Sequence, residues 1–216
     1  MKKTKTVIYI VRHGESVGNL NKICLGHTDL GLTEKGEKQA KATALALKNV
    51  EFAAIYSSDL CRAINTALPH AELRGISIEK TPNLRELYFG EWENRSVDWI
   101  KENYGELFTV GWRQIFGDFT PPGGEYVPHM AERVAEELKN IAREYSGANI
   151  LVTSHAAAIR ALWGKISGFE PKEWGAANPY PTNASYSIIE FDGDRLIPVK
   201  YSSDEHLGQL ATPLLS

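Results

Sequence analysis

Cysteine is scarce in this sequence, which has only Cys24 and Cys61 among its 216 residues. Two cysteines are too few for a disulfide framework, and their spacing matches no zinc site. Small disulfide-linked scaffolds and structural zinc folds are therefore excluded. Such limited use of cysteine is typical of a reducing compartment, so we expect a cytoplasmic protein.

Long apolar runs are also missing. The run from Val7 to Val11 has five residues and no run is longer. A membrane helix needs about 20 apolar residues, and the core of a signal peptide has about 7–15. We therefore expect no membrane-spanning segment, no export signal and no membrane partner.

Neither sign of charge forms a long block. The 24 basic and 27 acidic residues give a net charge of −3, with a pI near 6.1. This balance does not favour a broad positive surface for duplex binding, although it is compatible with a local basic site. Nucleic acid is therefore not an expected partner.

Several catalytic motifs are absent as well. The sequence contains no H-E-x-x-H or G-x-G-x-x-G motif, with which zinc proteases and dinucleotide-binding enzymes are recognised. The segment Gly31–Gly36 has the two glycines of a nucleotide-triphosphate loop, but Glu37 follows where lysine is required, and no strand is expected before it. The six histidines show no metal-ligand spacing. We expect no metal and no cofactor.

The chain does contain strand-like and helix-like segments in alternation. Continuous β-branched runs predict buried strands, and apolar residues at steps of three and four predict amphipathic helices. The expected strands are 6–11, 53–57, 76–80 and 149–153, followed by a hairpin of 185–191 and 195–201 around Asp192-Gly193. The expected helices are 33–48, 58–69, 127–147 and 155–168. This order predicts an α/β fold, a three-layer α/β/α sandwich with a mostly parallel sheet and a C-terminal antiparallel hairpin, as a single domain over residues 1–216.

Individual residues predict where these elements begin and end. Thr33 is expected to cap the first helix, and Ser58 or Asp59 to cap the second. Pro69 should kink or end that second helix. Pro198 suits an edge strand, because proline cannot donate to a neighbouring strand.

Polar segments follow three of the predicted strands. Arg12 and His13 follow the first strand, residues 57–62 the second, and Ser154 and His155 the fourth. Because ligands of such sheets bind at the carboxyl ends of the strands, we expect these segments to converge on one site. Arginine forks match phosphate oxygens, and a neutral imidazole can accept a phosphoryl group, so the cluster predicts a phosphate-sized anion site. A carboxylic acid with a raised pKa could then protonate the leaving alkoxide.

A series of short motifs runs through most of the chain in a fixed order. They are Val11–Ser16 with Asn19, Gly26–Asp29, Leu32-Thr33 with Gly36, Ser57–Arg62 with Thr66-Ala67, Leu84–Glu86, Phe89-Gly90, Trp92-Glu93, Pro122–Glu125 and Ser154-His155. Each motif alone is weak, but their ordered combination is specific. It resembles the histidine phosphatase superfamily, in the branch that includes cofactor-dependent phosphoglycerate mutases and related small phosphatases. Asn94 departs from the family pattern, which usually has glycine after Trp-Glu.

The resemblance implies a role for each residue of the anion site. It implies that His13 is the phosphoryl acceptor and that Glu86 is the general acid and base. The residues implied to bind the phosphoryl group are Arg12, Asn19, Arg62 and His155, of which His155 is also counted as catalytic.

Other interpretations of these residues stay open. His155 begins a helix and could simply cap it, whereas helix N-termini also favour anions. Glu91 and Glu93 lie close to Glu86 and are alternative proton donors. Cys61 adjoins the phosphate-binding arginine, but no C-x5-R loop accompanies it, so we expect an unreactive thiol.

The pattern loosens from Leu84 to Glu125 and becomes rich in aromatic residues, and the segment 92–125 is the candidate for a lid. Ser96 can cap a short helix, and Pro121–Gly124 interrupts the pattern. Aromatic residues at near-helical spacing are typical of a core, and the alternative is a hydrophobic lid over the substrate. The residues concerned are Trp99, Tyr104, Phe108, Trp112, Phe116 and Phe119.

Together these observations favour a metal-independent phosphomonoesterase that hydrolyses small phosphorylated metabolites through a phosphohistidine on His13. The mutases of the family carry a longer segment between the Glu86 region and the Pro-Gly-Gly turn, which favours hydrolysis. Two alternatives stay open: phosphoglycerate mutase-type transfer, which needs a bisphosphate primer, and a non-catalytic phosphate-binding protein. The sequence names neither the leaving group nor the oligomeric state.

Overall fold

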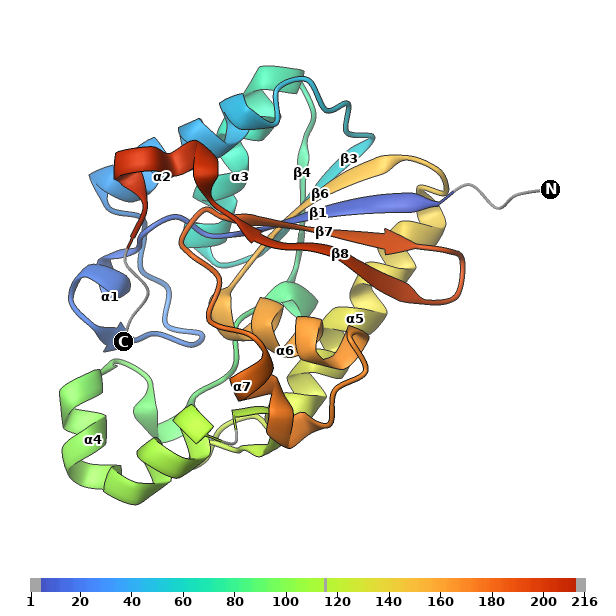
Figure 1. The fold of residues 1–216 in the computed structure, drawn as a ribbon. Helices are drawn as coiled ribbons and strands as arrows, with labels where there is room; N and C mark the ends of the chain where they lie inside the picture. Colours follow the sequence, from blue (N-terminus) through green and yellow to red (C-terminus); the bar gives the residue numbers. More distant parts are fainter. Residues whose placement is uncertain (1–4, 115, 213–216) are drawn as a thin grey trace.

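The computed structural model describes residues 5–114 and 116–212, which are arranged around a six-stranded sheet (Figure 1). The strand order is β4-β3-β6-β1-β7-β8. The bounds of these strands are β1 Thr6–Arg12, β3 Ala54–Ser58, β4 Ile78–Thr81, β6 Asn149–Ser154, β7 Tyr186–Phe191 and β8 Leu196–Ser203. A separate pair joins β2 (Ile23–Cys24) to β5 (Arg95–Ser96).

The sheet is parallel on one side of β1 and antiparallel on the other. Strands β4, β3, β6 and β1 pair in parallel, whereas β7 pairs antiparallel with both β1 and β8. This arrangement confirms the predicted α/β class and the added C-terminal hairpin. Pro198 lies in the edge strand β8, as predicted.

Helices cover both faces of the sheet, as Figure 1 shows. Helices α2 (Glu34–Ala46) and α3 (Cys61–Arg74) lie on one face, and α5 (Val127–Glu144) and α6 (Ala156–Ile166) on the other. Neighbouring residues of a strand point to opposite faces. In β1, Ile10 therefore belongs to the core that includes α5 and α6, and Val11 to the core beneath α2 and α3.

Helix α3 corrects the predicted cap residue and rules out one of the two outcomes expected at Pro69. Its N-cap residue is Leu60, without a side-chain cap, so the prediction that Ser58 or Asp59 caps it is wrong. Ser58 is still part of β3, and both carboxylate oxygens of Asp59 accept hydrogen bonds from Arg85 at 2.6 Å. Pro69 does not end the helix, which continues for five more residues to Arg74.

The turn after Pro69 is held by tertiary contacts. Proline cannot donate to the carbonyl group of the preceding turn, but Arg74 donates to the carbonyl oxygens of Leu47 and Val50 beyond the helix. The other cap predictions are confirmed. The side chain of Thr33 accepts from the Gly36 amide at the start of α2, and Ser96 accepts from the Trp99 amide at the start of α4.

The described residues of the segment 92–125 include helical structure that Figure 1 shows in green, away from the sheet. It contains α4 (Val97–Glu106), a π-helix (Leu107–Gln114) and a 3₁₀ turn (Phe116–Asp118). Phe108, Phe116 and Phe119 are buried in the main core, and Trp92 packs against the rings of Phe108 and Phe119. This packing favours the core interpretation of the aromatic residues.

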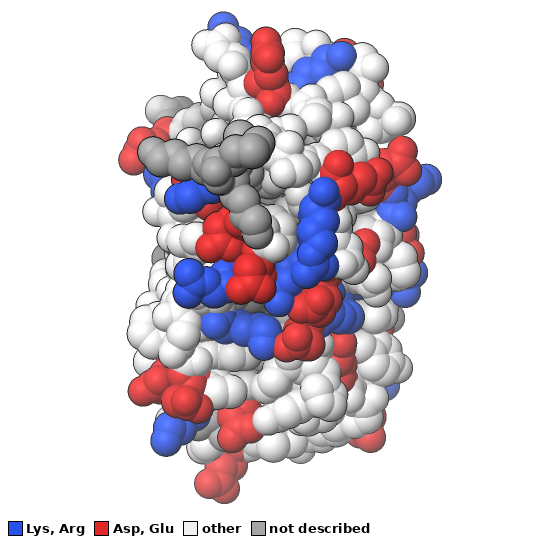
Figure 2. All heavy atoms as spheres, turned by 90° about the vertical axis from the view of Figure 1, so that its right-hand side faces the viewer, with Lys and Arg blue, Asp and Glu red and all other residues white. Residues whose placement is uncertain are grey.

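The remaining short elements join the larger ones. They are α1 (Val17–Leu20), α7 (Trp174–Ala177) and 3₁₀ turns at Pro82–Leu84, Gly90–Trp92, Pro171–Glu173 and Glu205–Leu210. No helix among the described residues has both the length and the apolar character needed to cross a membrane. On the face shown in Figure 2, acidic and basic side chains are interspersed.

Candidate active site

The predicted convergence of three strand ends is observed. Strand register places Arg12 at the end of β1 beside Ser154 at the end of β6, and the amide of His13 donates to the Ser154 carbonyl at 2.9 Å. The imidazole rings of His13 and His155 lie close together, with their centroids 5.2 Å apart and their planes tilted by 59°. Side chains that are distant in sequence therefore share one edge of the sheet.

His13 is buried, and its ring has a defined orientation. Its Nδ1 lies 2.7 Å from the carbonyl oxygen of Gly14. A carbonyl oxygen only accepts, so Nδ1 carries the hydrogen and Nε2 carries the lone pair. Burial, with the nearby positive charges of Arg62 and Arg12, holds the pKa of His13 well below its usual value. The ring is therefore a neutral imidazole at neutral pH, which is the nucleophilic form.

His155 occupies the N-cap position of α6, yet its side chain makes no cap hydrogen bond. Its Nε2 is instead 2.8 Å from the hydroxyl oxygen of Ser58, at the end of β3. Burial, with the charge of Arg62 and the neighbouring His13, holds the pKa of His155 well below its usual value. The interpretation of His155 as a simple side-chain cap is wrong. Ser58 lies in the segment 57–62 that was expected at the site, but its role in orienting the His155 ring was not predicted.

The two arginines of the site are bound to backbone carbonyl groups. Arg12 donates to Pro181, and Arg62 donates to Gly26 and Thr28 at 2.6 and 2.9 Å. Carbonyl oxygens orient a guanidinium without cancelling its charge, so both remain available to an anion. The Nε of Arg12 is buried and has no hydrogen-bond partner among the described residues. An incoming phosphate oxygen is a suitable acceptor for this donor.

Burial affects the titration of both guanidinium groups. It lowers the pKa of Arg12 to about 10 and also lowers that of Arg62, and in each case the negative charge of Glu86 is the largest opposing influence. Both groups still carry a full positive charge at neutral pH. Glu86 is thus the carboxylate most closely coupled to the pair.

The carboxylate of Glu86 lies at the N-terminus of α6. Its Oε1 accepts from the amides of Leu87 and Ala158 at 3.0 Å, and its Oε2 accepts from the amide of Ala157 at 3.1 Å. Helix N-termini stabilise such negative groups. Oε2 accepts only one of these bonds, so it has room for a proton while Oε1 stays bound.

The alternative proton donors have other partners. Glu93 accepts from the backbone amides of His27 and Phe89, and Glu91 accepts from the hydroxyl of Tyr104 at 2.6 Å. These contacts tie both carboxylates to the surrounding loops. Glu86 is the member of the three that binds the helix following His155.

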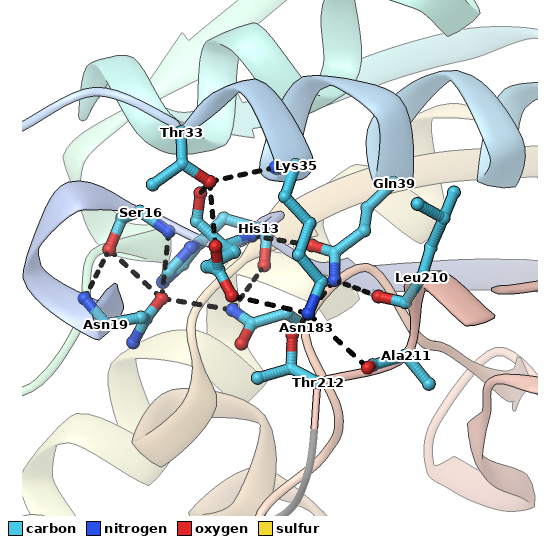
Figure 3. A network of polar contacts seen from close by, with 12 residues as sticks. His13, Ser16, Asn19, Thr33, Lys35, Gln39, Asn183, Leu210, Ala211 and Thr212 are labelled. Atoms are coloured by element: carbon cyan, nitrogen blue, oxygen red, sulfur yellow. Dashed lines mark hydrogen bonds and ion pairs between the residues drawn. The ribbon is translucent and has the colours of Figure 1, made fainter.

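Asn19 is oriented by a second asparagine, which Figure 3 shows beside His13. The side-chain oxygen of Asn19 accepts from Ser16 and from Nδ2 of Asn183. Asn183 also donates to the carbonyl oxygen of His13 at 3.1 Å. With its oxygen engaged, Asn19 has its NH₂ group left to offer a phosphate oxygen. Asn183 was not predicted, because only the antiparallel pairing of β7 with β1 brings its segment to this edge.

The loop after His13 is fixed to α2 by two glycines and by the buried side-chain amide of Gln39, which is labelled in Figure 3. A side chain on Gly14 would meet the carbonyl oxygen of Gly36 at 2.5 Å, so these segments can approach only as glycines. The side-chain oxygen of Gln39 accepts from the amide of Glu15 at 2.7 Å, and Glu15 accepts from the hydroxyl of Thr33. This packing explains why the first and third motifs occur together.

Asn94 fits the backbone position where glycine is usual. Its φ is 59°, in the left-handed region, and its amide donates to the carbonyl oxygen of Cys24 at 2.7 Å. Asparagine tolerates this region better than most side chains. The departure from the family pattern is therefore conformationally conservative.

Cys61 has the unreactive character expected of it. Burial, together with a hydrogen bond to Asp29, raises the pKa of the Cys61 thiol to about 11. Its thiolate is therefore scarce at neutral pH. Among the described residues, no group of three or more histidine, cysteine or acidic side chains is arranged to hold a metal ion.

Comparison with known proteins identifies the family. The family model of the histidine phosphatase superfamily (branch 1) matches residues 8–204. The chain belongs to this superfamily. It is 31% identical over 203 residues to phosphoserine phosphatase 1 of Hydrogenobacter thermophilus, with 94% of each chain covered. It is 36% identical over 165 residues to a probable phosphoglycerate mutase GpmB of Photorhabdus laumondii, with 74% of each covered.

A solved structure agrees with this assignment. Bacillus stearothermophilus YhfR superposes with a TM-score of 0.87 at 29% identity, covering 94% of this chain and 99% of the other. Homologues of the superfamily include both phosphatases and mutases, as the two relatives above illustrate. The predicted family and the phosphoglycerate mutase-like fold are thus confirmed.

Proposed function

We propose that this protein is a metal-independent phosphomonoesterase that works through a phosphohistidine on His13. One observation carries the proposal: His13 is a neutral imidazole beside two arginines whose charges are not cancelled by direct carboxylate partners. The contact of Nδ1 with the Gly14 carbonyl leaves Nε2 as the attacking atom. Arg12 and Arg62 supply the charge stabilisation that Mg²⁺ gives in other phosphoryl-transfer enzymes.

The first displacement transfers the phosphoryl group to His13. The Nε2 lone pair attacks phosphorus, the P–O ester bond breaks, and its electron pair leaves on the alcohol oxygen. Glu86, protonated on its free Oε2 position, gives that oxygen a proton. Arg12, Arg62, Asn19 and His155 hold the three equatorial oxygens during transfer.

The second displacement returns the enzyme to its starting state. Glu86, now a carboxylate, takes a proton from water as the water oxygen attacks phosphorus. The P–N bond breaks, and its electron pair returns to Nε2 of His13. The products are an alcohol and inorganic phosphate, and both His13 and Glu86 have recovered their original protonation.

Two features support hydrolysis over mutase chemistry. The match to a phosphoserine phosphatase extends over 94% of both chains, compared with 74% for the mutase relative. The second is the expectation from the sequence that mutases carry a longer segment than this chain between the Glu86 region and the Pro-Gly-Gly turn. A mutase would require a bisphosphate primer, whereas this reaction requires only water.

The test is to trap the intermediate. Protein mixed with p-nitrophenyl [³²P]phosphate, in the presence of a chelator, should keep its label when quenched in alkali and lose it in acid, as a nitrogen-bound phosphoryl group does. His13→Asn should abolish the label and reduce turnover by about 10⁴-fold, as expected for loss of a nucleophile. The matched control is His129→Asn, which changes an exposed histidine on α5.

Two outcomes would contradict the proposal. One is turnover in His13→Asn near the unmodified rate, and the other is a strict need for a divalent ion after chelation. A requirement for a bisphosphate primer would instead favour the mutase. A screen of about 100 phosphorylated metabolites on the unmodified protein would then identify the leaving group.

A further inference from the structure

The residues leading to Glu86 have their carbonyl groups bound by side chains. Four consecutive carbonyl oxygens, those of residues 83–86, accept such bonds. Ser154 donates to Leu84 at 2.8 Å, and His27 donates through Nε2 to Glu86 at 2.9 Å. The remaining donors all come from Arg133 on α5. The position of this irregular segment therefore depends on particular side chains.

Arg133 uses every N–H donor of its guanidinium. Its Nη1 donates to the carbonyl oxygens of Asn83 and Arg85, each at 3.0 Å, and its Nη2 donates to that of Glu86 at 3.0 Å. The other two donors bind the Glu125 carboxylate as a fork, with Nε to Oε1 at 2.8 Å and Nη2 to Oε2 at 2.9 Å. A planar guanidinium with five donors suits this set, and an ammonium does not.

Glu125 comes from the Pro-Gly-Gly-Glu motif, which has no role in the proposed chemistry. Its amide donates to the carbonyl oxygen of Tyr88 at 2.8 Å. A Cβ atom on Gly124 would lie 2.5 Å from the same Tyr88 oxygen. The motif therefore packs directly on the loop that follows Glu86. Arg133 thus binds carbonyl groups up to and including that of Glu86, and Glu125 binds the carbonyl group of Tyr88 just after it.

We propose that Arg133, fixed by Glu125, is a positioning residue that sets the Glu86 carboxyl group for proton transfer, an inference that rests on the proposed function. The Glu86 side chain binds amides of α6, while its backbone is anchored to α5 through Arg133. A shift of the backbone against α6 changes where the proton is delivered. Misplacement by about 1 Å at a reacting group can cost 10²-fold in rate.

The variant that tests this is Arg133→Lys, because lysine keeps the charge but has three donors in place of five. Formation of phosphohistidine from an alkyl phosphate should slow by about 10–10²-fold. The burst of p-nitrophenol from p-nitrophenyl phosphate should slow by less than about 3-fold, since this leaving group departs without a proton. Arg143→Lys, the same substitution on the same helix, is the control and should change neither rate.

A merely structural role gives a different result. The amplitude of the p-nitrophenol burst counts the correctly folded sites, so instability lowers the amplitude and leaves the two rate constants in their original ratio. Glu125→Gln is a second variant that keeps the side-chain size and removes the ion pair. We expect about 3–10-fold slowing on the alkyl phosphate alone, because hydrogen bonds to charged groups are stronger than neutral ones.

The decisive measurement combines Arg133→Lys with Glu86→Gln. If Arg133 acts through Glu86, Arg133→Lys should slow His13 phosphorylation by the alkyl phosphate less than about 3-fold when Glu86 is already glutamine. Equal slowing of alkyl and aryl substrates, or full additivity in the double variant, overturns the inference while leaving the phosphohistidine intact. Loss of labelling at His13 in the unmodified protein would instead reject the proposed function itself.

Discussion

The two sides of the candidate site are built by different means. The side proposed to hold the phosphoryl group stands at the ends of β1, β3 and β6, whose positions the sheet register fixes. The side proposed to deliver the proton stands on residues 83–86, whose carbonyl groups depend on side chains from α5 and neighbouring loops. Changes on the first side should therefore affect every substrate, and changes on the second should depend on the leaving group.

The strongest test of this contrast is Glu86→Gln. On alkyl phosphates it should slow phosphorylation of His13 by about 10²–10⁴-fold, the range for a positioned general acid. Glu86→Gln should slow the p-nitrophenol burst much less, because the burst reports only formation of the phosphohistidine. The later attack of water on the phosphohistidine can still be slower. Single-turnover measurements separate the two steps. If the burst slows as severely as alkyl cleavage, Glu86 organises the site and the proton donor must be sought first at Glu91 or Glu93.

The same contrast explains what the sequence could predict. The strand predicted over residues 6–11 contains a continuous apolar run and stops at Arg12-His13, so its type and its end followed from the pattern. That its end meets the ends of two other strands followed from topology. Asn183 and Arg133 had no such signal. Each acts through a hydrogen bond to a distant backbone carbonyl group, which depends on the three-dimensional path of the chain.

Local competition accounts for the wrong boundaries. Ser58 and Asp59 both suit a helix cap, but the Ser58 hydroxyl contacts His155 and the Asp59 carboxylate binds Arg85. Pro69 was expected to kink or end its helix, but Arg74 secures the following turn from outside. In each case a tertiary contact outweighed a local preference.

That the whole chain forms one domain stays a prediction.

Arg62→Ala should give the uniform response expected of the phosphate side. It removes a buried charge that we propose contacts the transferred group, so His13 phosphorylation should slow by about 10²–10³-fold from alkyl and aryl phosphates alike, comparable to the loss of a transition-state donor. Arg74→Ala on the same helix is the matched control, because Arg74 also binds carbonyl groups but lies at the far end. If Arg62→Ala slows alkyl and aryl phosphates to different extents, the proposed separation of a phosphate-binding side from a proton-delivering side is wrong.

The smallest expected effect is on the pH dependence of the unfolding free energy. It comes from His70, which lies on α3, the helix that carries Arg62. His70 is fully buried, and neither ring nitrogen has a hydrogen-bond partner among the described residues. Burial lowers the pKa of His70 to about 3, with smaller contributions from Arg74 on the same helix and His206 on the C-terminal 3₁₀ turn. In the unfolded chain the pKa of histidine is about 6.5.

Between these two pKa values the unfolded state binds a proton that the folded state excludes, so folding stability falls as the pH is lowered. For His70 alone this loss is about 2 kcal/mol between pH 7 and pH 5. His70→Phe, which keeps a ring and removes the titration, should reduce the pH dependence of the urea-unfolding free energy by that amount. His129→Phe, at the surface, is the control for loss of one histidine. An unchanged pH dependence in His70→Phe would mean that His70 is protonated in the folded protein as readily as in the unfolded chain. The buried position of His70 on α3 would then accommodate a positive charge.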